Sequence, residues 1–229
     1  MPAAPGRGST IVTMNTVIVG TGPVSFADVI AVARDGAAVA LSPEAEAGVT
    51  ASRKVIDALA RDAAPHYGVS TGFGALATKH IPAEQRVQLQ RSLIRSHAAG
   101  SGPEVEAEVV RAMMLLRLST LATGRTGVRL AVARAYAAML SASITPVVRE
   151  YGSLGCSGDL APLAHCALAA MGEGTVRVAG GPAARRARPS RRPASRRWSS
   201  PRRRDSRWST APTGCSACSC WPPRTCAGC

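Results

Sequence analysis

Apolar and polar positions follow strand-like spacing at the start of the chain and helical spacing further on. Two short runs, Thr16–Val19 and Ala38–Leu41, contain β-branched or apolar residues and lie on either side of a helical stretch from Phe26 to Arg34. Gly36 would stop that helix, because glycine adopts the left-handed conformation that ends helices. The pattern predicts a small α/β unit at the beginning of the chain.

A second helix is predicted from Ser42 to about Arg61. Ser42 offers a hydroxyl cap, Pro43 fits the first helical position, and Glu44 places a carboxylate in the first turn. Apolar or small residues then recur at helical spacing, and we expect them to form the buried stripe of this helix. These residues are Val49, Ser52, Val55, Ile56 and Leu59.

Three further helical patterns predict that the body of the chain is mainly α-helical, with long antiparallel helices. They run from Pro82 to about His97, from Glu104 to Leu121 and from Val128 to Leu140. Glycine-rich breaks at 100–103 and 124–127 separate them. A loop of small residues, 66–78, joins the second predicted helix to the third.

The charge of the chain is concentrated at its C-terminal end. The 229 residues carry a formal net charge of +14, but residues 1–182 hold 16 Lys and Arg against 13 Asp and Glu, whereas 183–229 hold 12 Arg and one Asp. From Gly180 onward there is no Leu, Ile, Val, Phe, Tyr or Met, so we expect this part to form no core and to be disordered. The predicted organisation is a disordered leader at 1–13, a folded region at 14–178 and a tail at 179–229.

Composition also limits the kinds of partner. No segment has the ~18 apolar residues of a membrane span, and the N-terminus has no signal-peptide core, so we expect a cytoplasmic protein without a membrane partner. The Arg-rich tail would at most bind nucleic acid nonspecifically. His66, His80 and His165 show no metal-ligand spacing, and the close cysteine pairs of the tail are a weak zinc signal, so no metal is expected.

The segment 151–163 carries the strongest chemical signal. From its residues alone it is a Gly/Ser loop leading into a helix, with Asp159 and Pro162 in the first turn. The expected buried face of that helix consists of Leu160, Leu163, Ala164 and Leu168.

The string GSLGCSGDLAPLAHCAL in this segment resembles the signature of the aromatic amino acid lyases, which include histidine, phenylalanine and tyrosine ammonia-lyases and related aminomutases. The resemblance implies that Cys156, Ser157 and Gly158 condense without an external cofactor into a 4-methylidene-imidazol-5-one ring (MIO). The Gly158 nitrogen would attack the Cys156 carbonyl, and Ser157 would lose water to leave an electrophilic methylene. A glycine suits the attacking position because it has no Cβ to hinder the approach.

Two further segments carry the resemblance. His66–Gly74 is similar to the tyrosine loop of the family, which implies that Tyr67 is the acid–base residue that removes the β-proton of the substrate. Because the glycine spacing fits neither a GxGxxG nor a P-loop pattern, a phosphate-binding loop is disfavoured. The sequence SHAAG around His97 is similar to the histidine-specific branch, which implies that His97 holds the imidazole of the substrate. Tyrosine-specific relatives also have a histidine there, and a capping or packing role for His97 remains the alternative from the residues alone.

The resemblance runs from about Met14 to Gly174 and implies a fumarase/aspartase-like helical bundle that assembles as a homotetramer. The implied reaction converts L-histidine to trans-urocanate and ammonia, the first step of histidine degradation. Tyrosine or phenylalanine chemistry in the same family is one alternative, and an inactive truncated product is the other. The restricted alphabet of 179–229 is typical of a GC-rich gene translated out of frame, so we expect a frameshift near residue 180, which resequencing would test.

Overall fold

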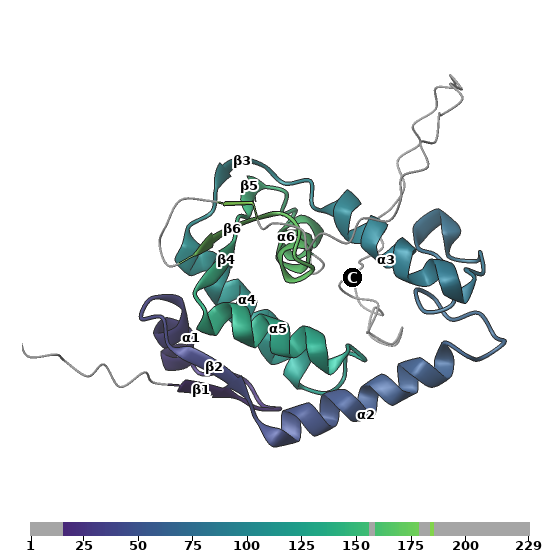
Figure 1. Ribbon diagram of the computed structural model, residues 1–229, viewed down its shortest axis with the longest axis horizontal. Helices are drawn as coiled ribbons and strands as arrows, with labels where there is room; N and C mark the ends of the chain where they lie inside the picture. Colours follow the sequence, from purple (N-terminus) through teal and green to yellow (C-terminus); the bar gives the residue numbers. More distant parts are fainter. Residues whose placement is uncertain (1–15, 156–158, 179–183, 186–229) are drawn as a thin grey trace, which may run out of the picture.

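The computed structural model describes residues 16–155, 159–178 and 184–185. The triplet Cys156, Ser157 and Gly158, the leader and nearly all of the tail lie outside the described residues, as do the cysteine pairs of the tail. About half of the described residues are helical, which confirms the prediction of a mainly α protein (Figure 1). The helices are α1 (Phe26–Ala33), α2 (Pro43–Leu59), the short 3-10 helix η1 (Gly74–Leu76), α3 (Ala83–His97), α4 (Ala107–Ala122), α5 (Leu130–Ser141) and α6 (Leu160–Ala170).

The strands are short and form three small sheets. In the first sheet β1 (Thr16–Val19) pairs in parallel with β2 (Ala38–Leu41), and α1 connects the two strands. This arrangement agrees with the predicted α/β unit. The other two sheets are antiparallel. They contain β3 (Ser101–Glu104) with β5 (Arg149–Tyr151), and β4 (Ile144–Pro146) with β6 (Thr175–Val178) and β7 (Ala184–Arg185).

Local sequence explains the ends of the first two helices. Ser25 caps α1 through a reciprocal capping box with Asp28, and Gly36 follows the helix with a positive φ of 72°. Ser42 caps α2 by accepting a hydrogen bond of 3.2 Å from the Ala45 N–H, and Pro43 occupies the first turn. The predicted starts of both helices are therefore confirmed.

The core of the described residues is centred on α4. This helix packs against α1, α2 and α5, and its fully buried side chains include Met114, Leu115 and Leu118. The strands β1 and β2 add Val19 and Val39, so the α/β unit and the helices share one core. The predicted stripe of α2 is correct at Val49, which is fully buried, and wrong at Val55, which is 59% exposed because this half of α2 extends beyond the core.

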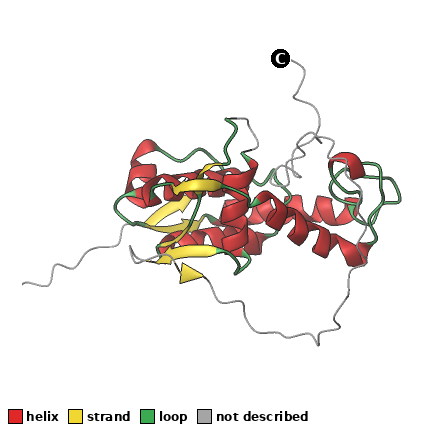
Figure 2. Cartoon of the chain, turned by 90° about the horizontal axis from the view of Figure 1, so that it is seen from above, coloured by secondary structure: helices red, strands yellow, loops and turns green. Residues whose placement is uncertain are grey.

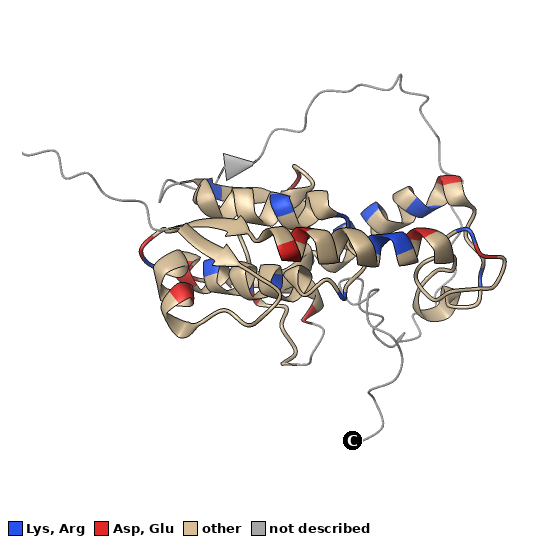
Figure 3. Cartoon of the chain, turned by 90° about the horizontal axis from the view of Figure 1, so that it is seen from below, with Lys and Arg blue, Asp and Glu red and all other residues tan. Residues whose placement is uncertain are grey.

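Figures 1 and 2 show an elongated molecule with the strands gathered at one end. Helices α2 and α3 run toward the other end, where the loop 60–82 joins them (Figure 1). Acidic and basic positions are interspersed along the described helices, in keeping with the nearly neutral charge of the body (Figure 3). No helix in the described ranges is both long enough and apolar enough to span a membrane.

The segment after α3 differs from its prediction. Residues Ser101–Glu104 form strand β3 on β5, and α4 begins three residues later than expected, at Ala107. The Val105 N–H donates to the Val148 carbonyl at 3.0 Å, a partner that lies far away in the sequence. Gly102 has a φ of +83°, and the ring of Tyr151 lies where a Cβ would stand. The hydrophobic pattern of residues 100–107 could not predict strand β3, because its pairing partner β5 lies more than 40 residues away in the sequence.

The buried face predicted for α6 is mostly wrong. Only Ala164 of the four expected residues is buried, whereas Leu160, Leu163 and Leu168 are partly exposed. Helix α6 packs against α3, α5 and β4, and small side chains allow close approach on several sides. The buried residues of α6 are Ala161, Pro162, Ala164, Cys166 and Ala169.

Candidate active site

Tyr67 lies in the loop between α2 and α3, at the end of the molecule away from the strands (Figure 1). Its side chain is 52% exposed, and its ring meets that of Phe73 edge-on, with 5.8 Å between the ring centroids. The Gly74 N–H approaches the Tyr67 hydroxyl oxygen at 3.5 Å, the outer limit of a hydrogen bond. About half of the surface of Tyr67 is thus left uncovered by the described residues.

Buried hydroxyl groups give the Tyr67 loop its shape. Ser70 is fully buried, and its Oγ accepts from the His66 N–H at 2.9 Å. The Thr71 Oγ1 accepts from the Gly68 N–H at 3.3 Å and donates to the Gly72 carbonyl at 3.1 Å. Sequence reasoning did not assign roles to Ser70 and Thr71, although hydroxyl residues between glycines are typical of side chains that bond to the local backbone.

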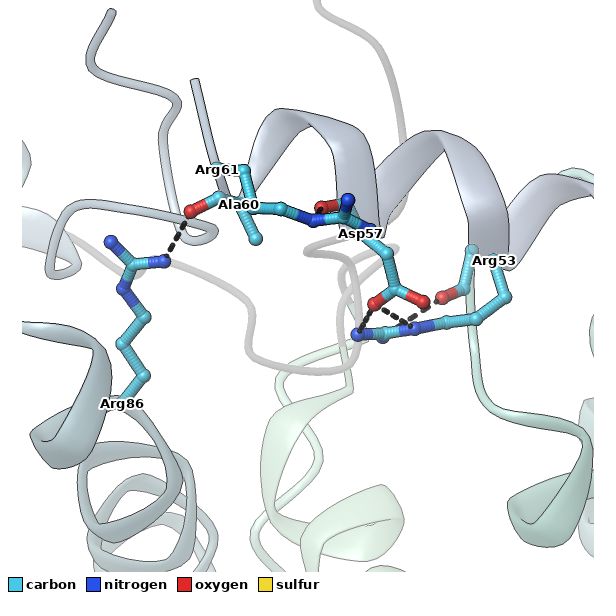
Figure 4. A network of polar contacts seen from close by, with 6 residues as sticks. Arg53, Asp57, Ala60, Arg61 and Arg86 are labelled. Carbon is cyan, nitrogen blue, oxygen red and sulfur yellow. Dashed lines mark hydrogen bonds and ion pairs between the residues drawn. The ribbon is translucent and has the colours of Figure 1, made fainter. Parts of the chain in front are cut away.

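The same loop is fixed to the beginning of α3. The Ile81 N–H donates to the Ser70 carbonyl at 2.9 Å, and the Gly72 N–H donates to the Lys79 carbonyl at 3.1 Å. Arg86, in the first turns of α3, donates to the carbonyls of Ile81 and Ala60 and so joins the loop to the end of α2 (Figure 4). The position of Tyr67 is therefore tied to the N-terminal end of α3.

His97 is the last residue of α3, at the opposite end of that helix. Its Nδ1 lies 2.8 Å from the Leu93 carbonyl oxygen, and a carbonyl can only accept, so Nδ1 carries the proton of this bond. In the neutral ring, Nε2 then bears the lone pair, and no described residue bonds to it. His97 thus presents a nitrogen that a ligand could use.

The Tyr67 loop and His97 are attached to opposite ends of α3. The loop of Tyr67 is anchored just before Ala83, whereas His97 ends the helix 14 residues later. At 1.5 Å per residue this corresponds to roughly 20 Å along the helix axis. The attachment point of the Tyr67 loop is therefore separated from His97 by the length of α3.

The residues beside the triplet lie against the segment that follows His97. A Cβ at Gly152 would stand 3.1 Å from the Cα of Gly100 and 2.9 Å from the Cβ of Ala161, so three parts of the chain meet here. Gly155 has a φ of +65°, and the Gly155 N–H donates to the Ser153 Oγ at 3.3 Å. His97, three residues before Gly100, thereby lies close in the chain to the contact with Gly152.

Asp159, the first described residue after the triplet, is in a strained conformation. It precedes α6 with a φ of +35°, in the left-handed region that residues other than glycine rarely adopt. Its Oδ1 is buried and has no hydrogen-bond partner among the described residues. The described residues thus leave a buried acceptor without a donor at the N-terminal end of α6, where the helix carries partial positive charge. These features fit a compact, electrophilic group formed from the triplet.

A cluster of side chains holds the segment 100–104. The Nε2 of His165, on α6, accepts from the Gly100 N–H at 3.2 Å. Arg149 donates to the Gly102 carbonyl at 3.3 Å and pairs with Glu104, which also pairs with Arg177. Sequence reasoning considered His165 only as a metal ligand, and the described residues contain no group of His, Cys, Asp and Glu that could hold a metal ion.

The chain is similar to known proteins over most of its length. The family model described as aromatic amino acid lyase matches residues 24–196. A histidine ammonia-lyase from Streptomyces coelicolor is 63% identical over 174 residues, which cover 73% of this chain and 34% of that protein. The chain thus spans about a third of the length of the curated relatives it matches.

Solved structures of the same kind have a similar fold. A histidine ammonia-lyase from Trypanosoma cruzi superposes with a TM-score of 0.65 and 36% identity, covering 72% of this chain and 31% of that one. A tyrosine aminomutase from Streptomyces globisporus gives a TM-score of 0.67 and 37% identity, covering 73% and 31%. The resemblance found in the sequence is thereby confirmed: the chain belongs to the aromatic amino acid lyase family.

Proposed function

We propose that this protein supplies the front part of a histidine ammonia-lyase, which converts L-histidine to trans-urocanate and ammonia. The identity of 63% to a histidine ammonia-lyase is the observation that carries this assignment. The free Nε2 of His97 supports it, since that nitrogen can bond to the N–H of a substrate imidazole. The proposal includes the helical bundle and homotetramer of the family.

The electrophile in this proposal forms from Cys156, Ser157 and Gly158. Gly155 and Asp159, both in the left-handed region, border the triplet in the sequence, and the backbone at Gly152 is closely packed. A constrained backbone at the triplet would favour attack of one backbone group on another, because reacting atoms that are held close together react faster. When formed, the methylidene-imidazolone supplies an electrophile that accepts electrons as the C–N bond of the substrate breaks.

His97 would orient the substrate. Its Nδ1 is engaged by the Leu93 carbonyl, so the ring is held in one tautomer with Nε2 as the acceptor. A substrate imidazole that donates to Nε2 would have its side chain fixed near the triplet. A tyrosine hydroxyl could donate to the same nitrogen, which makes tyrosine the competing substrate that the experiment must include.

Tyr67 would remove the β-proton of a substrate bound beside His97 of another chain. The exposed phenol and the separation of the two residues along α3 support this arrangement. A base must come within hydrogen-bond reach of the proton that it abstracts, and a loop held by Ser70 and Thr71 keeps Tyr67 ready for that contact. The family assembly into homotetramers would provide the second chain.

The experiment compares the purified protein with its Ser157→Ala variant. We expect the intact mass of the protein to lie below the sequence mass by two water molecules, and any turnover to give urocanate from L-histidine rather than coumarate from L-tyrosine. Ser157→Ala cannot form the methylene and should lose the turnover. Turnover of L-tyrosine alone would reassign the substrate, and an unmodified mass would refute the mechanism.

A further inference from the structure

His165 is a half-buried ionisable residue to which the proposed reaction assigns no role. It lies in the middle of α6, and its Nε2 accepts from the Gly100 N–H at 3.2 Å. Gly100 lies three residues beyond His97, in the turn that leaves α3. The contact is close, since a Cβ at Gly100 would stand 3.1 Å from Nε2 of His165 and 3.2 Å from the Cβ of Arg149.

We propose that His165 is a positioning residue that holds the turn after His97 against α6, and that it does so only as a neutral imidazole. An N–H group can only donate, so Nε2 must carry the lone pair and the proton must be on Nδ1. Protonation would place a second N–H against that of Gly100, and the hydrogen bond would become a repulsive contact. The role as a positioning residue rests on the function proposed above.

The turn has few other restraints near His97. The Ala98 N–H donates to the Ile94 carbonyl at 3.0 Å, and the Ala99 N–H donates to the His97 carbonyl at 2.8 Å, both within the end of α3. The bond to His165 attaches this turn directly to α6, the helix that begins at Leu160, beside the close contact of Gly100 with Gly152. Loss of that bond would let the turn, and with it the imidazole of His97, move relative to α6.

The surroundings of His165 favour the neutral form. Burial lowers the pKa of His165 below the ordinary 6.5, and the positive charge of Arg149 lowers it further. Helix α6 packs against α3, which carries Arg95 paired with Glu173, against α5, which carries Tyr136, and against β4, which has no charged residue. Arg149 of β5 lies beside Gly100 and acts on His165. Tyr136 stays neutral, because burial raises its pKa far above its ordinary value. The neutral state of His165 is thus present at neutral pH and is lost in acid.

The experiment is a pH titration of the full chain by nuclear magnetic resonance. We expect the Gly100 amide signal and the His165 ring to shift with one common midpoint, below the ordinary 6.5. The signal of His97 should also change at that midpoint. The Gly36 amide is the internal control, because no atom lies within 4 Å of where its Cβ would be, and it should stay unchanged.

Two variants make the result decisive. In His165→Gln the amide oxygen can still accept from Gly100 but does not titrate, so the Gly100 signal should stay near its neutral-pH position at every pH. His80→Gln removes an exposed histidine at the other end of α3 and should leave the Gly100 titration intact. A Gly100 signal that ignores the His165 midpoint, or that still titrates in His165→Gln, would overturn the proposal.

The outcome is independent of the proposed reaction. An unmodified intact mass would refute the lyase mechanism and leave the Gly100 titration as it is. A correct mass and active enzyme with a Gly100 signal insensitive to His165 would refute the positioning role alone. In active enzyme, His165→Gln should abolish the rise in KM for L-histidine that we expect in the wild type on acidification through the His165 midpoint.

Discussion

Arg111 is the one buried charged side chain among the described residues, and it illustrates how a single residue joins distant parts of the fold. It lies in α4 and is 6% exposed. Its guanidinium donates to the Val32 carbonyl at 2.7 and 3.0 Å and to the Leu140 carbonyl at 3.3 Å. These carbonyls lie near the C-terminal ends of α1 and α5, where helix carbonyls lack partners and partial negative charge accumulates.

Replacing Arg111 by Met should destabilise the protein by about 2–4 kcal/mol, because two buried carbonyls lose charged donors. Urea unfolding would show this as a lower midpoint with an unchanged slope. Arg34→Met is the matched control: Arg34 also joins α1 to α4, through Glu108, but its side chain is 64% exposed. We expect the control to cost less than about 1 kcal/mol, and equal effects of both variants would contradict the account.

At the scale of elements, α2 crosses the turn before α5 at a contact between two glycines. Gly124 has a φ of +70°, and a Cβ there would lie 2.8 Å from the carbonyl carbon of Gly48 in α2. Arg53 strengthens the same crossing by donating to the Gly127 carbonyl at 3.3 Å (Figure 4). The direction of α2 across the molecule therefore depends on the absence of side chains at this crossing.

Comparing the stability losses of Gly124→Ala and Gly36→Ala distinguishes the cost of steric overlap from the cost of a left-handed backbone conformation, because both glycines have a positive φ but only Gly124 is crowded. Gly36 has a similar φ of +72° but no atom within 4 Å of where its Cβ would be. Gly36→Ala should therefore cost only the left-handed penalty of about 1–2 kcal/mol. Gly124→Ala should cost roughly 1–3 kcal/mol more, because the methyl group overlaps the backbone of α2. Thermal unfolding of both variants checks this, and equal losses would show that the crossing is not tight.

Carboxylates of α2 should make the protein sensitive to acid. Hydrogen bonds from Arg134 lower the pKa of Glu46 from 4.5, and hydrogen bonds from Arg53 lower that of Asp57 from 3.8. A carboxyl whose pKa is lower in the folded state adds stability above its unfolded pKa and loses it as the pH falls through the folded value. The urea midpoint should therefore decrease as the pH is lowered from about 4.5. In Glu46→Gln this decrease should be smaller, and an identical profile would exclude the Glu46–Arg134 pair as a contributor.

At the scale of the whole molecule, the separation of Tyr67 and His97 determines what a working site requires. The loop of Tyr67 is fixed at one end of α3, and His97 ends the same helix. Helix α3 lies between these two attachments. The function proposed above therefore places the Tyr67 and His97 of one site on different chains.

Mixing two inactive variants tests this arrangement. Tyr67→Phe and His97→Leu should each reduce urocanate formation by at least about 100-fold when expressed alone. Co-expression should restore part of the activity, because some sites then combine an intact Tyr67 from one chain with an intact His97 from the other. Size-exclusion chromatography confirms that the variants co-assemble. Activity no higher than that of either variant alone would indicate that each site uses residues of one chain.

The sequence by itself determined the features that depend on neighbouring residues. Ser42 and Pro43 predicted the start of α2, and Gly36 predicted the end of α1, since these signals act over a few residues. The family likewise followed from one continuous string around residue 156. The roles of Tyr67, His97 and the triplet stay predictions, because they were inferred from that resemblance.

Only the tertiary structure decided what depends on segments far apart in the chain. The strand at Ser101–Glu104, the small-residue face of α6 and the acceptor role of His165 each need a partner 40 or more residues away. Such partners leave no periodic signal, because the hydrogen bond or close contact exists only after the core has formed. The sequence identified Tyr67 and His97 as candidates but not their placement. Only the structure attaches the loop of Tyr67 to the beginning of α3, with His97 at the end of the same helix.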